Sequence, residues 1–307
     1  MNARARASGK VILLGEHVVV YGRPAIAAGL PIGLEVEVTD GDGPSLVSDE
    51  EGLSDDPRPR RLIAEAAALA GVDPHRTVVR VRSDLPPGRG FGSSAALAVA
   101  TLRALFDATG RTLPLATALD LGRRLEAVFH GTSSGIDPAA AALGTCFRFV
   151  RGEPPSVTSL ELARPLPLVI AYGERARSTG AAVGGLRGRW EADRARHEAL
   201  FDAVASTVEQ GETAARAGDL DALGRAFDDN QGLLESLAVS SDETAALVAA
   251  ARRAGALGAK LTGGGGGGAV IALARDPETL AARLEHEGWR TTVVRIVSHA
   301  ARPEPEE

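Results

Sequence analysis

One glycine-rich segment has the residue types expected of a phosphate site. Residues 86–94 read Pro-Pro-Gly-Arg-Gly-Phe-Gly-Ser-Ser and lead directly into a predicted helix. Glycines allow tight turns and close backbone approach, and a helix N-terminus presents N–H groups and the positive end of its dipole. A plain turn with a serine cap is the alternative, but the second serine, Ser94, favours contact with a metal ion or a phosphate.

Two carboxylates lie on either side of a loop rich in Gly and Ser. They are Glu126 and Asp137. Phosphoryl transfer from ATP needs hard oxygen ligands for Mg²⁺ and a group that accepts or orients the proton of the acceptor hydroxyl. One carboxylate can bind the metal ion while the other acts as the base. Each acid alone would be interpreted as a solvated surface carboxylate, and the loop between them favours a functional pair.

Lysine is rare in this chain. Of its 34 basic residues only Lys10 and Lys260 are lysines, and both lie beside glycine-containing motifs. Lys10 is followed by Glu16 and His17 at the exit of a predicted strand. A lysine next to a carboxylate base can activate a hydroxyl and neutralise charge on the transferring phosphoryl group. Chance placement of Lys10 and a turn role for His17 are the alternatives.

A run of six glycines follows Lys260-Leu-Thr262, at Gly263–Gly268. Such a run is either a flexible linker or a wall of backbone beside a site. Its place between two strand-like segments favours the wall. The remaining histidines show no zinc-like spacing, and no Gly-x-Ser-x-Gly elbow occurs in a strand-to-helix context, so a zinc site and a hydrolase are disfavoured.

Hydrophobic periodicity supplies the elements that must position these segments. Strands are predicted at 10–14, 25–39, 77–82, 146–150, 167–172, 269–274 and 291–297. Helices are predicted at 60–70, from the glycine-rich loop to near 110, at 114–130, two or three times between 186 and 256, and at 276–287. Residues 40–57 and 173–185 are predicted to be loops, and 130–137 another. Strands and helices alternate, so we expect a mixed α and β class.

Length and composition set the outer limits. A chain of 307 residues is too long for one ordinary core, and its layout changes near residue 160, so we predict domains at 1–160 and 161–307. A net charge of −6 without a basic block disfavours nucleic-acid and membrane partners. The single cysteine, Cys146, excludes an intrachain disulfide. No signal-peptide pattern and no apolar run of membrane length are present, so a cytoplasmic location is expected.

The motifs together resemble the GHMP kinase family, in the form that its mevalonate kinases have. Four segments match in order: 10–22 (the N-terminal motif), 87–96 (the ATP-phosphate loop), 130–137 (the catalytic loop) and 260–268 (the glycine motif). The resemblance spans roughly residues 8–297. It implies an α+β, two-domain fold, with an N-terminal domain like ribosomal protein S5 domain 2 and a ferredoxin-like C-terminal domain.

The resemblance also implies a role for each motif residue, with ATP and Mg²⁺ as cofactors. Asp137 would be the catalytic base and Lys10 would activate the hydroxyl, while Ser94 and Glu126 would bind Mg²⁺. The implied ATP-binding residues are Pro87, Gly88, Gly90, Gly92, Ser93, Ser94 and Ala95. The implied substrate-binding residues are Glu16, His17, Ser134, Gly135, Thr262 and Gly264.

The implied reaction is transfer of the γ-phosphate of ATP to the 5-hydroxyl of (R)-mevalonate in isoprenoid biosynthesis. Phosphomevalonate kinase or another GHMP small-molecule kinase is the alternative, with Arg89, Arg175 or Arg177 available for a substrate phosphate. A non-catalytic ligand-binding relative would have lost the Lys, Glu or Asp of the site. The chain departs from the family pattern at Phe91 in place of Leu, Ser133 in place of Pro, Gly264 in place of Ala and Ala269 in place of Cys. A homodimer is the expected assembly.

Overall fold

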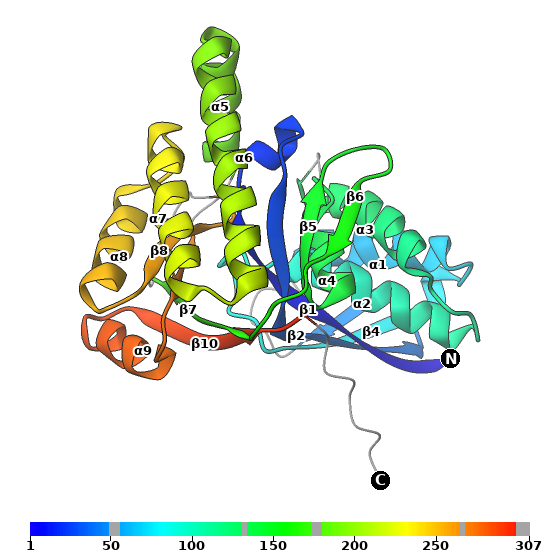
Figure 1. Ribbon diagram of the computed structural model, residues 1–307. Helices are drawn as coiled ribbons and strands as arrows, with labels where there is room; N and C mark the ends of the chain where they lie inside the picture. The colour runs from blue at the N-terminus through cyan, green and yellow to red at the C-terminus, as the bar shows by residue number, and fades with distance from the viewer. Residues whose placement is uncertain (49–55, 131–133, 174–179, 265–267, 299–307) are drawn as a thin grey trace. The chain divides into compact units, whose positions relative to one another are not determined.

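The computed structural model describes residues 1–48, 56–130, 134–173, 180–264 and 268–298 (Figure 1). They form two compact units. The first unit comprises Met1–Lys10, Gly29–Pro87 and Phe91–Gly144, and the second comprises Val11–Ala28, Gly88–Gly90 and Thr145–Glu307. Strands β1 (Asn2–Leu14) and β2 (Ala25–Asp40) therefore each contribute residues to both units.

The sheet of the first unit is built on β2. Residues 34–40 of β2 pair antiparallel with β4 (Thr77–Ser83), and β3 (Ser45–Ser48) pairs parallel with β4. The inward side chains of β2 at 34, 36 and 38 are buried, which confirms the alternation seen in the sequence. The prediction of a loop at 40–57 is wrong at β3. This strand was missed because its four residues include one buried apolar side chain, Leu46, and so show too little alternation to be recognised.

Of the four helices described in the first unit, three pack around the fourth. They are α1 (Pro57–Leu69), α2 (Ser93–Ala108), α3 (Leu115–His130) and α4 (Ile136–Leu143), with the short 3₁₀ turn η2 (Pro74–Arg76) before β4. Helix α2 contacts the other three, and its residues 95–102 are all buried, because alanines let neighbours approach from every side. Helix α4 was missed, since eight alanine-rich residues show no apolar stripe.

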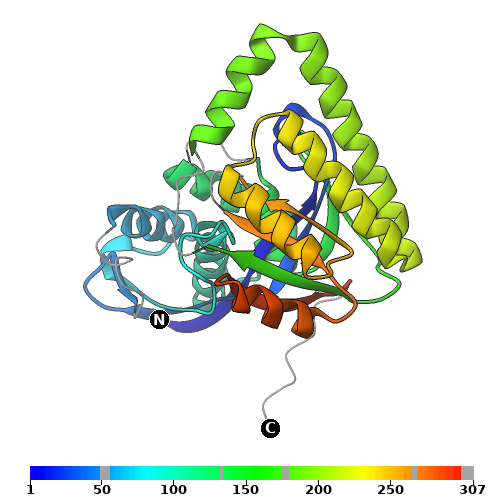
Figure 2. The same cartoon turned by 90° about the vertical axis from the view of Figure 1, so that its left-hand side faces the viewer.

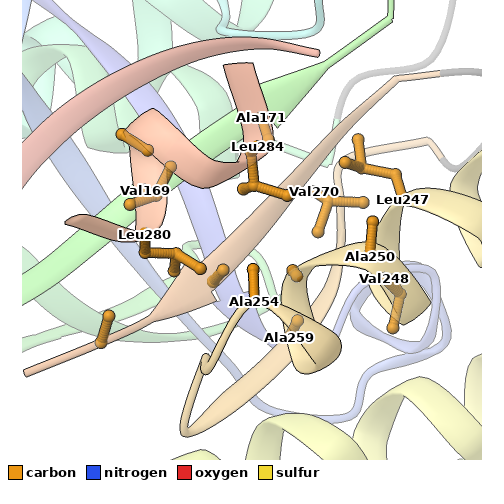
Figure 3. Close-up of a cluster of buried hydrophobic side chains, with 14 residues drawn as sticks. Val169, Ala171, Leu247, Val248, Ala250, Ala254, Ala259, Val270, Leu280 and Leu284 are labelled. Carbon is orange, nitrogen blue, oxygen red and sulfur yellow. The ribbon is translucent and has the colours of Figure 1, made fainter. Parts of the chain in front are cut away.

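The second unit contains a four-stranded antiparallel sheet in the order β10-β7-β9-β8. Its strands are β7 (Leu166–Tyr172), β8 (Gly258–Thr262), β9 (Ala269–Leu273) and β10 (Arg290–Ile296). Helices α8 (Asp242–Arg253) and α9 (Pro277–His286) pack on one face. Figure 3 shows the resulting aliphatic core, in which Val169 and Val270 of the sheet lie among Leu247, Leu280 and Leu284 of the helices.

The rest of the second unit is a smaller strand group and a set of long helices. Residues 25–28 of β2 pair with β5 (Cys146–Val150), which pairs with β6 (Ser156–Ser159). Helices α5 (Gly180–Ala192) and α6 (Arg194–Ala217) form the hairpin at the top of Figure 2, and α7 (Leu220–Ser236) packs against α6 and β8.

The helical prediction for this region needs correction. The described part of residues 180–253 forms four helices rather than two or three, and α5 begins inside the segment 173–185 that was predicted to be a loop. Glycines at 180, 184 and 185 hid the start of α5, because glycine usually marks a loop. None of the described helices has the length and apolarity needed to cross a membrane.

Candidate active site

The first unit brings together the two residues to which the chemistry was assigned. The Nζ atom of Lys10, on β1, lies 3.2 Å from Oδ1 of Asp137, in the first turn of α4. The side chain of Lys10 is 7% exposed and that of Asp137 is 23% exposed. The ammonium group is therefore largely shielded from water, while the carboxylate can still be reached by another molecule.

The backbone before α4 directs Asp137 into this position. Gly135 is the N-cap residue, with a left-handed φ of 85° that a side chain would disfavour. The hydroxyl oxygen of Ser134 accepts a hydrogen bond from the N–H of Ile136 at 3.3 Å. Ser134 and Gly135 thus shape the turn that carries Asp137, and their contact with a substrate stays a prediction. Ser133 lies outside the described residues.

Lys10 is also locked to the glycine turn that begins α2. Its backbone N–H donates to the carbonyl oxygen of Phe91 at 2.8 Å. Gly92 has a φ of 76°, and a Cβ placed on it would lie 2.7 Å from Cγ of Lys10. Residue 92 must therefore be glycine, both for its backbone angle and because the Lys10 side chain passes directly over it.

The start of α2 fits an anionic group. Helix α2 begins at Ser93, and the N-cap residue Gly92 has no side chain with which to cap the first turn. N–H groups at a helix N-terminus lack intrahelical acceptors and lie at the positive end of the helix dipole, a combination suited to phosphate. Ser93, Ser94 and Ala95 form this first turn, next to Lys10 in the same unit.

Glu126 lies on α3, which packs against α4. It is buried, and Gly122 one turn earlier is on the same helix face, where a Cβ would lie 2.9 Å from Cβ of Pro138. Among the described residues no group of three or more His, Cys, Asp and Glu side chains could hold a metal ion. Mg²⁺ can take most of its ligands from water and nucleotide phosphates, and its assignment to Ser94 and Glu126 stays a prediction.

Residues 88–90 of the predicted phosphate loop belong to the second unit. Gly88 and Gly90, which follow Pro87, have φ values of 67° and 76°, so both adopt the left-handed conformation of a tight turn. The guanidinium carbon of Arg89 lies 5.2 Å from the centre of the Tyr172 ring. This side chain is buried against an aromatic surface. The contacts of Pro87, Gly88 and Gly90 with ATP stay predictions.

Glu16 and His17 lie in the second unit, beside the second lysine. Glu16 and Lys260 form an ion pair in which neither side chain is exposed. His17 is 8% exposed. Burial, with the charges of Lys260 and Arg189, lowers the pKa of His17 to about 4. The imidazole is therefore neutral near pH 7.

The partner of Lys260 was missed from the sequence. The one signal was that Lys260 is among only two lysines in the chain. The pairing itself joins residues 244 positions apart, so no local spacing could have revealed it.

Thr262 ties the end of β8 to β1. Its hydroxyl accepts a hydrogen bond from the N–H of Ile12 at 3.0 Å and donates one to the Ile12 carbonyl oxygen at 2.9 Å. Gly264 follows in a half-buried bend after β8, which a free linker would not form. Residues 265–267 of the glycine run lie outside the described residues. Substrate contacts of Thr262 and Gly264 stay predictions.

Comparison with known proteins places this arrangement in a family. The model of the GHMP kinases N-terminal domain matches residues 60–145, and that of the GHMP kinases C-terminal domain matches residues 212–291. The mevalonate kinase of Thermococcus onnurineus is 33% identical, over 99% of this chain and 99% of its own length. The mevalonate kinase of Pyrococcus horikoshii is 34% identical, over 88% of each chain.

Solved structures agree with the sequence relatives. The crystal structure of L. major mevalonate kinase in complex with R-mevalonate has a TM-score of 0.87 and 27% identity, and the match covers 98% of each chain. This confirms the two-domain fold that the motifs implied. The chain therefore belongs to the GHMP kinase family and is an ATP-dependent small-molecule kinase.

Proposed function

We propose that this protein phosphorylates the 5-hydroxyl of (R)-mevalonate with ATP. The observation that carries the proposal is the Lys10–Asp137 pair beside the N-terminus of α2, in a chain related end to end to a mevalonate kinase. The L. major relative, which was solved in complex with R-mevalonate, supports this choice of acceptor.

In the proposed reaction, Asp137 accepts the proton of the acceptor hydroxyl. The hydroxyl oxygen forms a bond to the γ-phosphorus while the bond from that phosphorus to the β,γ-bridging oxygen breaks, and ADP leaves. The ammonium group of Lys10, 3.2 Å from Asp137, stabilises negative charge on the attacking oxygen and on the transferring group. The shielding of Lys10 strengthens this effect, because charges interact more strongly away from water.

The proposed nucleotide site is the glycine turn and the first turn of α2. The residues assigned to the phosphates are Pro87, Gly88, Gly90, Gly92, Ser93, Ser94 and Ala95. Ser94 and Glu126 are assigned to Mg²⁺. A bound Mg²⁺ would neutralise charge on the β- and γ-phosphates as the bond to the leaving group breaks.

The residues proposed to bind the acceptor come from three of the sequence motifs. Glu16, His17, Ser134, Gly135, Thr262 and Gly264 are assigned to the acceptor side. A neutral imidazole at His17 suits this role, because it can accept a hydrogen bond at one ring nitrogen and donate at the other. No assignment requires His17 to carry a charge.

A coupled assay of ADP release tests the proposal. Mevalonate and phosphomevalonate are offered separately, each with ATP and Mg²⁺, and we expect turnover of mevalonate. Turnover of phosphomevalonate alone would overturn the proposal in favour of the alternative kinase. Of the arginines considered for that alternative, Arg89 is stacked on Tyr172, and Arg175 and Arg177 lie outside the described residues.

The proposal also covers organisation and location. We place the boundary between the N-terminal and C-terminal GHMP kinase domains near residue 160, which lies between the two family matches. A cytoplasmic location is also part of the proposal. A homodimer is proposed as the assembly, and sedimentation velocity tests it directly.

A further inference from the structure

The reaction scheme above uses one of the two lysines in the chain and leaves Lys260 without a task. We propose that Lys260 is a positioning residue for the acceptor side of the site. By binding Glu16 it fixes the turn Gly15-Glu16-His17 and so sets the position of His17 toward the acceptor. This inference rests on the proposed function, because it assigns His17 to the acceptor.

Burial restricts Lys260 to an indirect role. Its ammonium group donates one hydrogen bond to Oε1 of Glu16 and another to the carbonyl oxygen of Leu261 at 2.6 Å. Neither Lys260 nor Glu16 has any exposed side-chain surface. Because both hydrogen bonds of its ammonium group end on buried protein oxygens, Lys260 acts on the acceptor side through the carboxylate that it holds.

The pattern of β8 shows that Lys260 faces the N-terminal motif. Side chains alternate along a strand, so Lys260 and Thr262 share one face, while Ala259 and Leu261 on the other face join apolar clusters. Thr262 binds the backbone of Ile12, and Lys260 binds Glu16. Strand β8 thus binds the segment 12–16 at two points, Ile12 and Glu16, through side chains on a single face.

The turn between these points is held on its other side as well. The amide oxygen of Asn230, on α7, accepts a hydrogen bond from the N–H of Gly15 at 3.2 Å. A Cβ on Gly15 would lie 2.5 Å from the Pro24 carbonyl oxygen, so the turn is packed against the start of β2. The backbone on both sides of Glu16 therefore has little freedom to compensate for a lost Lys260.

His17 depends on these anchors. It has a φ of 64°, a positive value that a residue with a side chain rarely adopts unless its surroundings impose it. Its Nε2 atom is buried and has no hydrogen-bond partner among the described residues. The charge of Lys260 also contributes to the lowered pKa of His17. Lys260 thus influences His17 through both geometry and charge.

Steady-state kinetics on a double-mutant cycle test the role. The variants are Lys260→Met, Glu16→Gln and the double variant, in which no unpaired buried charge remains. We expect each to raise KM for mevalonate about tenfold and to leave KM for ATP unchanged, with the double variant also near tenfold because both residues act as one unit. Arg275→Met, which breaks the exposed Arg275–Asp221 pair of the same unit, is the matched control and should behave as the wild type.

Two kinetic outcomes overturn the inference. One is an unchanged KM for mevalonate in folded Lys260→Met protein. The other is a double variant whose KM rises about a hundredfold, the product of two independent effects. If Lys260→Met does not fold, the comparison of the double variant with Glu16→Gln decides, since we expect the same KM in both.

A spectroscopic measurement separates this inference from the choice of acceptor. In protein labelled with ¹⁵N-histidine, the His17 ring signals are assigned with His17→Gln. We expect them to shift in Lys260→Met and to stay unchanged in Arg275→Met. If they shift while the wild type fails to phosphorylate mevalonate, the proposed acceptor is wrong and the positioning role stands. If they do not shift, Lys260 does not position His17, whatever the acceptor.

Discussion

The two lysines of this chain each pair with a carboxylate, but in different surroundings. Lys10 meets Asp137 in the first unit, where the carboxylate is partly exposed. Lys260 meets Glu16 in the second unit, where neither side chain is exposed. A carboxylate within reach of a bound hydroxyl can take its proton, whereas a fully buried pair must keep its charges matched. The same residue types thus suit chemistry in one unit and positioning in the other.

The largest expected effect comes from removing the base of the partly exposed pair. Asp137→Asn keeps the size of the side chain but cannot accept the hydroxyl proton. We expect kcat to fall by roughly 10²–10⁴-fold, the usual contribution of general acid–base catalysis. Steady-state kinetics measure this, with Glu16→Gln as the contrasting variant that changes KM instead. An unchanged kcat would refute the assignment of Asp137.

Loss of the lysine should destabilise the fold more in the buried Lys260–Glu16 pair than in the partly exposed Lys10–Asp137 pair. Lys260→Met removes the ammonium group that pairs with the buried Glu16 carboxylate, so we expect the free energy of unfolding to fall by about 3–5 kcal/mol. Lys10→Met leaves Asp137 accessible to water, and we expect a loss of only about 1 kcal/mol. Urea unfolding at pH 7 measures both variants. Equal losses would remove the distinction between the two pairs.

Acid should weaken the second unit through His17. Its pKa is about 4 in the folded protein against an ordinary value of 6.5, so between these values the unfolded chain binds more protons. The contribution of His17 to the free energy of unfolding is therefore fully present above pH 6.5. It is lost as the pH falls toward 4, by roughly 3 kcal/mol in total. Urea unfolding across this range should show a shallower acid loss for His17→Gln than for the wild type, while Asp137→Asn keeps this part of the loss. Parallel curves for His17→Gln and wild type would contradict the buried neutral imidazole.

The smallest expected effect compares the two buried glutamates. If Glu126 binds Mg²⁺, Glu126→Ala should raise the Mg²⁺ concentration for half-maximal rate at least about tenfold, since even outer partners of a metal site typically contribute that much. Glu16→Gln should leave the Mg²⁺ requirement unchanged, because Glu16 is paired with Lys260. Activity measured over a Mg²⁺ titration checks both. A shift of the same size in each variant would argue against a metal role for Glu126.

Local pattern was enough to predict most elements of the fold. The alternation in β2 and the helix after the glycine turn were both predicted near their observed bounds. Strand β3 and helix α4 were missed because each is short and has no repeating apolar pattern. Helix α5 was misjudged because glycine, normally a sign of a loop, occurs in its first turns.

The candidate site was predictable to a lesser degree. Motif residues identified Lys10, Asp137 and the first turn of α2, which the structure brings together in one unit. The partnership of Lys260 with Glu16 could not be predicted, because it forms only when the chain folds residues from its two ends together. Sequence spacing reports on neighbours along a helix or strand and carries no information about such contacts.

Strand β1 passes from the first unit to the second immediately after Lys10, and this limits how the protein can be divided into fragments. A fragment starting at Thr145 would lack residues 11–28, which belong to the second unit. It would therefore lose Glu16, which neutralises Lys260, and the backbone of Ile12, to which Thr262 is hydrogen-bonded. Gene fusion or module exchange between relatives that transplants the C-terminal half must carry this N-terminal segment along, for instance by circular permutation.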